Sequence, residues 1–466
     1  MPLSPLAGPP RRGWSWLTQG EGVRVLFLHQ NFPGQFLHVA TALKREGRHE
    51  LLAVVPETNA RPPLIPTRTY RFDAAAVRAG EPLAQHYAER AARGAAVAQT
   101  LDALRRDGFT PDLVVGHGGW GETLFVRDVW PRSPVLLHAE FFYAAEGADA
   151  GFDRELSGPA PDRFALQVRA RNAAMALALL DADRGVAPTR WQASRFPESL
   201  RAKIALAHEG VDTDHVRPSP GAEVRLGRAG GVVLRPGDEV LTFVSRDLEP
   251  HRGYHVLMRA LPAILARRPR ARAVIVGGDG ASYSPRPASG RSWKTVFLAE
   301  VANRLDRDRV HFVGRIPYPT LLQLLQVSAA HVYLTYPFVL SWSMLEAMSA
   351  GALVIGSRTP PVEEVIEDGR NGVLRDFFDV DGIADAVVDA LARPARYRAL
   401  RDAGRQTIVD RYDLKRVCLP AWRRLLGEVA GSRAAQPDAP TVGAEAPVAC
   451  TEAAVTFGER ADAEVH

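Results

Sequence analysis

Short apolar runs, each followed by a segment long enough for a helix, recur along most of this 466-residue chain. A continuous apolar run of about five residues is typical of a strand buried on both faces of a parallel sheet. In the first half such runs lie at 23–28, 50–55, 112–116, 134–139, 184–188 and 203–207. In the second half they lie at 241–245, 273–277, 310–314, 331–336 and 352–356. The alternation predicts α/β domains built on parallel sheets.

Residues 209–223 interrupt this alternation with turn formers and prolines, and they show no periodicity. A chain of this length also exceeds one ordinary core, so two domains are expected. The predicted fold is therefore two tandem Rossmann-like domains that face a central cleft. The predicted parts are a flexible leader (1–20), an N-terminal domain (21–215), a C-terminal domain (216–415), a helix packing back towards the N-terminal domain (416–430) and a disordered tail (431–466).

The composition excludes several classes of protein. Apolar runs are interrupted well before 18 residues, so no membrane-spanning helix is expected. Cys418 and Cys450 are the two cysteines, which argues against a disulfide framework and indicates the cytoplasm. The net charge of +5 is modest, and basic residues are not interleaved with aromatic ones, so nucleic acid is not an expected partner. An anionic small molecule or peripheral contact with the inner face of a membrane stays open.

Arginines follow the first strand of the second half. Ligands of doubly wound sheets bind beyond the carboxyl ends of the strands. Arg246 and Arg252 would there clamp a diphosphate, because guanidinium groups meet phosphate oxygens in pairs of hydrogen bonds. The alternative is two solvated arginines in an arginine-rich chain.

The next strand ends carry weaker signals. Gly278, Asp279 and Gly280 form a turn at which backbone could approach a nucleotide, and Arg315 follows a further strand. No G-x-G-x-x-G spacing is present, so the dinucleotide fingerprint is missing.

The sequence allows two roles for Glu346. With Ser343 it has the spacing of a capping box, in which both side chains only cap a helix. The functional alternative is a carboxylate that accepts hydrogen bonds from ribose hydroxyls. Free amides around Ser341, Trp342 and Ser343 would then face a phosphate.

Five segments of the second half resemble one family. They are FVSRDLEPHRG (243–253), VGGDG (276–280), VHFVGRIP (310–317), YPFVLSWSMLEAMSAGALVIGS (336–357) and VEEVIEDGRNGVL (362–374). They are similar to the C-terminal half of the group-1 glycosyltransferases, which are retaining enzymes of two-domain GT-B fold. The segments HQNFPGQFLHVATAL (29–43) and GHGGWGETLFVRDVWP (116–131) resemble an N-terminal domain of one bacterial branch.

The resemblance implies a hexosyltransferase-like activity in glycan biosynthesis. A nucleoside-diphosphate sugar would bind the C-terminal domain, and a sugar, lipid or small-molecule acceptor the N-terminal one. Arg246 falls on the family's phosphate-binding arginine, and Arg252 falls where most members carry lysine. Glu346 falls on the second glutamate of the E-x7-E motif, which contacts ribose. At the first glutamate, near the transferred sugar, this chain has Phe338.

Candidate residues of the first half are less specific. Gly34 would let backbone approach a phosphate or the acceptor, or would serve only a tight turn. His117 precedes a glycine-rich turn in which Trp120 would stack on a sugar or belong to the core. His138 and Glu140 lie near the place of the family's catalytic histidine, and we favour Glu140.

No cofactor or metal is expected. The chain has no His/Cys cluster with ligand spacing, so protein groups are expected to stabilise the leaving diphosphate. Three alternatives stay open: another GT-B enzyme such as a sugar-nucleotide epimerase or a phosphorylase, a nucleotide-sugar-binding protein whose catalysis has lapsed, and an NAD-dependent dehydrogenase. Scarce lysine opposes a phosphorylase of glycogen type.

Overall fold

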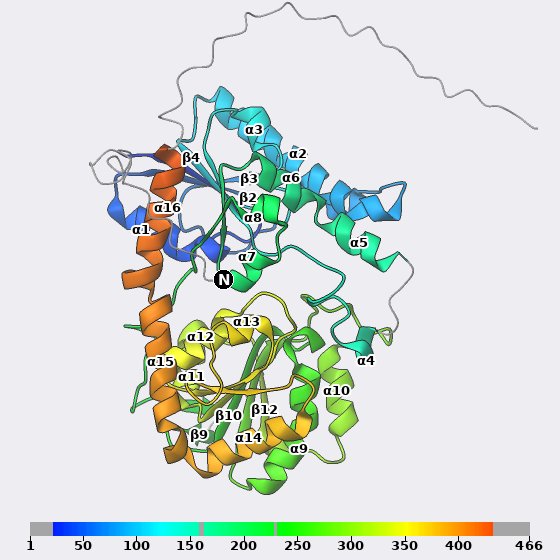
Figure 1. Ribbon diagram of the computed structural model, residues 1–466, viewed down its shortest axis with the longest axis vertical. Helices are drawn as coiled ribbons and strands as arrows, with labels where there is room; N and C mark the ends of the chain where they lie inside the picture. The colour runs from blue at the N-terminus through cyan, green and yellow to red at the C-terminus, as the bar shows by residue number, and fades with distance from the viewer. Residues whose placement is uncertain (1–21, 158–162, 228–230, 432–466) are drawn as a thin grey trace, which may run out of the picture.

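The computed structural model describes residues 22–157, 163–227 and 231–431 and consists of two α/β domains, one above the other in Figure 1. The predicted leader (1–20) and almost all of the predicted tail (431–466) lie outside the described residues. The two tandem Rossmann-like domains expected from the apolar runs are confirmed.

The N-terminal domain is a parallel sheet whose strands follow the order β3-β2-β1-β4-β5-β6-β7. The strands are β1 (Arg24–Leu28), β2 (Glu50–Pro56), β3 (Thr67–Tyr70), β4 (Leu113–His117), β5 (Val135–His138), β6 (Arg184–Ala187) and β7 (Ile204–Leu206). The helices are α1 (Leu37–Glu46), α2 (Gln85–Arg106), α3 (Val126–Val129), α4 (Arg154–Ser157), α5 (Phe164–Arg171), α6 (Ala173–Asp181), α7 (Arg190–Ser194) and α8 (Glu198–Arg201). The sequence did not reveal β3, because its residues Thr-Arg-Thr-Tyr are mostly polar and exposed.

The C-terminal domain is a second parallel sheet, with the order β12-β11-β10-β13-β14-β15, and an antiparallel pair β8-β9. The strands are β8 (Val224–Leu226), β9 (Val232–Leu234), β10 (Val240–Asp247), β11 (Arg272–Gly278), β12 (Val310–Gly314), β13 (Ala330–Tyr333), β14 (Leu353–Ser357) and β15 (Val373–Arg375). The helices are α9 (Tyr254–Arg267), α10 (Trp293–Val301), α11 (Tyr318–Val327), α12 (Trp342–Ser349), α13 (Pro360–Glu363), α14 (Val380–Ala392), α15 (Arg398–Tyr412) and α16 (Leu419–Gly431).

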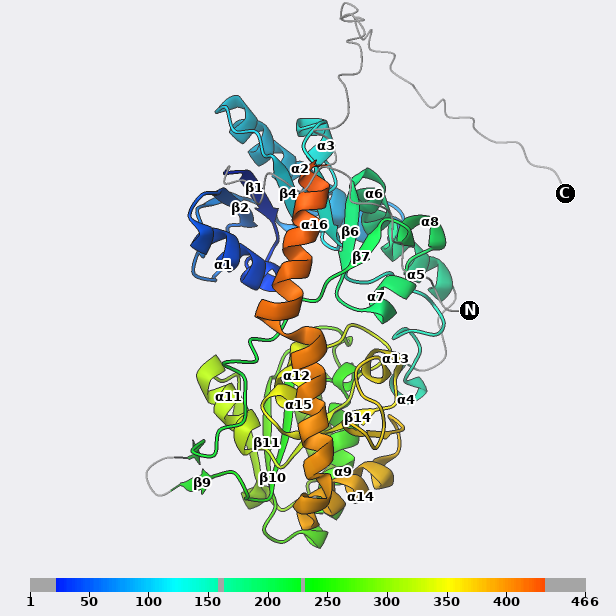
Figure 2. The same cartoon turned by 60° about the vertical axis from the view of Figure 1, so that its left-hand side comes forward.

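The last helix of the described residues, α16, returns to the N-terminal domain. Helix α15 lies against the C-terminal domain, a short π-helix (Leu414–Cys418) follows, and α16 then runs along the N-terminal domain, as both views show (Figures 1 and 2). Trp422 is buried in the core that surrounds β1, and its indole N–H donates to the carbonyl of His208 (3.1 Å). The two domains are thus joined by two separate stretches of chain.

A third crossing leaves the N-terminal domain after β5. Helix α4 lies beside α9 and α10 of the C-terminal domain (Figure 1). Asp153 is buried there, accepts a hydrogen bond from the Tyr336 hydroxyl (2.8 Å) and lies 3.1 Å from His255. Glu155 binds the guanidinium of Arg259 with both oxygens (2.8 and 2.5 Å). This crossing, residues 141–157, is called the bridging segment below.

Candidate functional site

The candidate residues gather at the switch point of each sheet. In the N-terminal sheet the switch point lies between the neighbours β1 and β4, from which the strand order runs in opposite directions. In the C-terminal sheet it lies between β10 and β13. Loops diverge at such points and leave a crevice at the carboxyl ends of the strands. Phe141, beyond β5, contacts Phe338, beyond β13, with ring centroids 4.7 Å apart. The two carboxyl edges therefore face each other.

Stacked rings form the N-terminal side. The rings of Trp120 and His117 are nearly parallel with centroids 3.8 Å apart, and His138 stacks on the other side of His117 at 5.0 Å. The His29 ring is nearly perpendicular to the rings of His117 and Trp120, with centroid distances of 5.5 Å and 5.0 Å. Trp120 is half-buried, and its ring stacks on that of His117.

Glu140 sits beside this stack. Its Oε1 accepts a hydrogen bond from Gln35 (2.9 Å), and its Oε2 lies 3.5 Å from Nε2 of His117. The backbone amide of Gly119 donates to Nδ1 of His117 (3.0 Å), so a neutral His117 carries its proton on Nε2, towards Glu140. Burial opposes the charge of Glu140, but His117, His138 and Gln35 prevail and lower its pKa to about 2. Glu140 is therefore an anion at neutral pH.

His29, which the sequence did not single out, orders the same group. Its Nε2 lies 2.7 Å from Oε1 of Gln35, so Gln35 links His29 to Glu140. Burial and the neighbouring His117 lower the pKa of His29 to about 3, which keeps it neutral. Gly34 has a φ of +46°, and a Cβ there would lie 2.3 Å from the His29 ring. In this structure Gly34 makes room for His29.

A buried carboxylate joins the two sides. Oε1 of Glu209 lies 3.3 Å from Nε2 of His138, and its Oε2 accepts the indole N–H of Trp342 (3.3 Å) from the start of α12. His208 and His138 hold the pKa of Glu209 below its usual value although burial opposes this. Glu209 thus connects the His138 ring to α12 of the C-terminal domain.

On the C-terminal side, the carboxylate of Asp247 organises the ends of β10, β11 and β12. It accepts hydrogen bonds from the amide of Gly280 (3.2 Å) and from Arg315 (2.8 Å). A Cβ at Gly278 would lie 2.5 Å from the same carboxylate, so this glycine accommodates Asp247. Asp279 is exposed and pairs with Lys294 (3.1 Å).

The two arginines after β10 have different environments. Arg246 is exposed and has no hydrogen bond or ion pair with another described residue. Arg252 is only 7% exposed, and its Nη1 donates to Thr335 (2.8 Å) and to the carbonyl of Val339 (3.0 Å). Arg246 is therefore available to a ligand, whereas Arg252 holds the loop after β13.

That loop also carries Phe338, which is 3% exposed. Besides Phe141, its ring contacts Tyr143, His251 and Tyr283. An aromatic cluster thus occupies the position at which the family carries its first glutamate.

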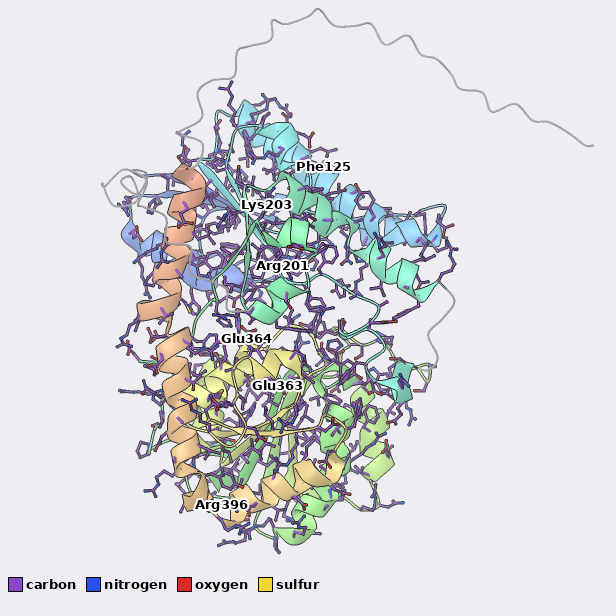
Figure 3. The ribbon with its side chains drawn as sticks, in the orientation of Figure 1. Phe125, Arg201, Lys203, Glu363, Glu364 and Arg396 are labelled. Carbon is purple, nitrogen blue, oxygen red and sulfur yellow. The ribbon has the colours of Figure 1, made fainter. Side chains whose placement is uncertain are left out.

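Helix α7 of the N-terminal domain holds the same loop. The indole N–H of Trp191 donates to the carbonyl of Phe338 (3.0 Å). Glu364 of the C-terminal domain in turn accepts the amides of Arg190 (2.8 Å) and Trp191 (2.7 Å) at the start of α7; Figure 3 shows it on the edge of the domain that faces this helix. Neither residue was predicted, because their partners are about 150 to 170 positions away in sequence.

Of the two interpretations of Glu346, the capping box with Ser343 is wrong. Helix α12 begins at Trp342, and its N-cap is Ser341, whose side chain accepts the amide of Ser343. Glu346 is the fifth residue of the helix, beyond the first turn, so it does not cap. Two of the amides expected to be free have partners: Ser341 donates to the Tyr333 hydroxyl (2.8 Å) and Ser343 to Ser341 (3.4 Å).

Glu346 instead accepts a hydrogen bond from the hydroxyl of Tyr318 (2.8 Å), at the start of α11. Burial raises the pKa of Glu346 to about 7. This carboxyl group is poised between its two protonation states near neutral pH, unlike Glu140.

Across the described ranges, no group of three or more His, Cys, Asp or Glu side chains is arranged to hold a metal ion. None of the helices placed within those ranges is both long and apolar enough to span a bilayer.

Comparison with known families gives two matches. Residues 47–216 match the family described as glycosyl transferase family 4 group, and residues 231–407 match glycosyl transferases group 1.

Curated relatives are named as sugar-transferring enzymes. The chain is 33% identical over 239 residues to a GDP-mannose-dependent alpha-(1-6)-phosphatidylinositol monomannoside mannosyltransferase of Mycolicibacterium smegmatis, covering 50% of this chain and 59% of the relative. It is 28% identical over 235 residues to a D-inositol 3-phosphate glycosyltransferase of Streptomyces avermitilis, covering 46% of this chain and 48% of the relative. The matches thus span about half the length of these relatives.

Solved structures share the fold. HepE of Anabaena, solved with UDP and glucose, has a TM-score of 0.60 at 18% identity, covering 86% of this chain and 99% of that one. Sucrose-phosphate synthase of Thermosynechococcus elongatus has a TM-score of 0.62 at 18% identity, covering 87% and 99%. At these identities the likenesses show the fold alone, which is the two-domain GT-B fold.

Proposed function

Since the chain belongs to the group-1 glycosyltransferases and is an enzyme that uses a nucleotide-sugar donor, we propose that it transfers a hexose or a related sugar with retention of configuration. The observation that carries the proposal is the position of Glu140 and Arg246 on the two carboxyl edges that face each other. A carboxylate on one side and an unpaired guanidinium on the other suit an acceptor hydroxyl and a departing diphosphate.

The donor would lie on the C-terminal side. Arg246 would bind the diphosphate, helped by the amide of Trp342, and Glu346 would bind the ribose hydroxyls. Arg315 and the turn at Gly278 to Gly280 border the nucleotide. Arg252 would act by holding the loop after β13 unless it turns towards the diphosphate when donor binds.

The reaction breaks the bond between the anomeric carbon and the diphosphate, and it forms a bond to the acceptor oxygen. Negative charge grows on the diphosphate, where Arg246 stabilises it, and no metal is required. Positive charge grows at the sugar, where an ionised Glu140 is favourable. The acceptor proton leaves with the reaction, and the phosphate oxygens or Glu140 would take it.

The acceptor is a sugar, a lipid or a small molecule bound by the N-terminal domain. The mycobacterial relative is named for phosphatidylinositol monomannoside and the streptomycete one for D-inositol 3-phosphate. A hydroxyl of a phosphorylated polyol is the acceptor that these names favour. The cytoplasm, at the inner face of the membrane, is the setting we propose.

A second candidate is a protein that binds nucleotide sugars but no longer transfers them. Phe338 and its aromatic neighbours favour it, because they occupy the position nearest the transferred sugar. We prefer the transferase because Arg246, Glu346 and Glu140 are all present.

The test is a screen of UDP-, GDP- and ADP-sugars for thermal stabilisation, since ligand binding to the folded state raises the unfolding midpoint. The donor that binds is then incubated with an acceptor panel in EDTA, and nucleoside diphosphate release and the anomeric configuration of the product are measured. Release with retained configuration is expected. Binding without release over the whole panel would favour the second candidate, and the absence of any binding would refute both.

A further inference from the structure

A small pocket of about 80 Å³ lies within the N-terminal domain beside Glu140. Part of its lining is the candidate site itself: His117, Trp120 and Glu140. The rest comes from α2, from the loop after β5 and from the junction of α5 and α6, and includes His86, Arg90, Tyr143, Arg171 and Asn172. The pocket is thus continuous with the acceptor side of the proposed reaction and separate from the donor loops.

Basic groups dominate the part of the lining away from Glu140. His86 and Arg90 are one turn apart on α2, so their side chains share one face of that helix. Arg171 lies at the end of α5, with its guanidinium 4.0 Å above the ring of Tyr143. Glu140, the one carboxylate among the described lining residues, is already engaged by Gln35 and His117.

Two of these basic groups have polar atoms that lack a partner. Nε of Arg90 and Nδ1 of His86 are buried and have no hydrogen bond to any described residue. Arg90 has a carboxylate neighbour through Nη1, which donates to Glu89 (3.0 Å). A buried donor without an acceptor costs free energy, so such atoms occur where a ligand or water supplies the missing partner.

The charges in the pocket also repel one another. The pKa of His86 is lowered to about 4, first by burial and then by the positive charges of Arg90 and Arg171. Beyond the lining, burial raises the pKa of Asp149 to about 6, and Arg171 acts against this rise. Arg90 and Arg171 are thus two cations at one cavity, with Glu89 paired to Arg90 and Glu140 on the lining.

We propose that this pocket binds a phosphate group carried by the acceptor, and that the acceptor is therefore a phosphorylated sugar or polyol. The inference rests on the proposed function and names its acceptor class. The two guanidinium groups suit the paired oxygens of a phosphate. The volume accommodates a phosphate but not a sugar ring as well, so the ring would lie at the mouth, against Trp120 and next to Glu140.

The first experiment measures binding of inorganic phosphate, so it needs neither donor nor turnover. The protein carries Arg246→Ala throughout, so that the donor loops do not contribute. Arg90→Gln and Arg171→Gln are each expected to weaken phosphate binding at least tenfold, because each removes a charge-assisted hydrogen bond. Arg169→Gln is the matched control: it changes an exposed arginine of α5 that does not line the pocket, and its binding should equal that of the parent.

Equal phosphate binding by Arg90→Gln, Arg171→Gln and the control would overturn the proposal, as would the absence of phosphate binding by the parent. A failure of the proposed function has a different signature: phosphate still binds and depends on Arg90, but the protein with Arg246 intact neither binds nor consumes a nucleotide sugar.

The second experiment distinguishes the two sources of such a phosphate. The parent is titrated with myo-inositol 1-phosphate, with myo-inositol, and with phosphatidylcholine vesicles that contain or lack phosphatidylinositol. Binding of the free ester but not of the vesicles identifies a soluble phosphomonoester. Binding of the phosphatidylinositol vesicles, lost in Arg90→Gln, identifies a lipid headgroup. Equal affinity for myo-inositol and its phosphate would contradict the proposal.

Discussion

On the C-terminal side of the domain interface, candidate groups come from successive strand ends within about one hundred residues: Arg246, Gly278, Arg315 and Glu346. On the N-terminal side they come from distant places, with Gln35, His117, Glu140 and Glu209 meeting only after folding. The C-terminal groups are exposed or border solvent, whereas the N-terminal ones are largely buried among stacked rings. The first arrangement suits a mobile, highly charged donor, and the second holds one carboxylate in a fixed ionisation state.

If the N-terminal side performs the chemistry, Glu140→Gln should have the largest effect. The substitution keeps the shape and removes the charge, so kcat should fall by about a hundredfold to ten-thousandfold while the Kd of the nucleotide stays unchanged. Stopped assays of nucleoside diphosphate release and calorimetry measure the two quantities. Glu198→Gln, at the exposed first residue of α8 in the same domain, is the control. A nucleotide Kd that rises in parallel would assign Glu140 to the donor instead.

Arg246→Ala tests whether the C-terminal side stabilises the diphosphate. The loss of one charge-assisted hydrogen bond is worth about 1.5–3 kcal/mol, so release should slow about tenfold to a hundredfold. Arg304→Ala changes an exposed arginine away from the strand ends and should leave the rate unaltered. Full turnover by Arg246→Ala would remove the residue from the donor site.

The pH dependence of nucleotide binding separates the two carboxylates. Glu346 accepts ribose hydroxyls fully only when ionised, and its pKa is raised to about 7. Affinity should therefore rise up to about tenfold between pH 6 and 8. Glu346→Gln should bind weakly with a flat profile, and Glu140→Gln should keep the wild-type profile.

Linkage gives the matching effect on stability. The pKa of Glu346 is higher in the folded chain than in the unfolded one, so the carboxyl's contribution to stability is complete below about pH 4 and is lost as the pH rises through about 7. Thermal unfolding of the free protein should thus depend less on pH in Glu346→Gln. An unchanged dependence would mean that Glu346 titrates as an exposed carboxyl.

The smallest effect is expected where the two sides touch. Trp342→Phe keeps an aromatic side chain but removes the indole N–H that donates to Glu209. A hydrogen bond of this length, 3.3 Å, is worth about 0.5–1.5 kcal/mol. Nucleotide affinity should fall about threefold, with kcat nearly unaltered. A large loss of kcat would show that Glu209 transmits donor binding to His138, and the contrast between the two sides would then need revision.

The same contrast explains what the sequence predicted. The fold followed from buried apolar runs, because their burial on both faces appears directly in composition, whereas the short strands β3 and β15 lack that signal. Arg246 and Glu346 could be proposed as site residues because they occupy fixed places in contiguous motifs. His29, Gln35, Glu209 and Arg90 were not, since nothing local distinguishes a histidine or arginine that a distant strand end will bury.

The bridging segment has a consequence for how substrates enter. Any swing that parts the domains must either pull Asp153 from Tyr336 and Glu155 from Arg259, or carry α4 along with the C-terminal domain. In the second case the stretch from Phe141 to Asp153 is drawn away from β5, and Tyr143, a wall of the phosphate pocket, moves with it. Domain opening for the donor would then also change the shape of the acceptor pocket. The two substrates would therefore bind in a set order without contacting each other.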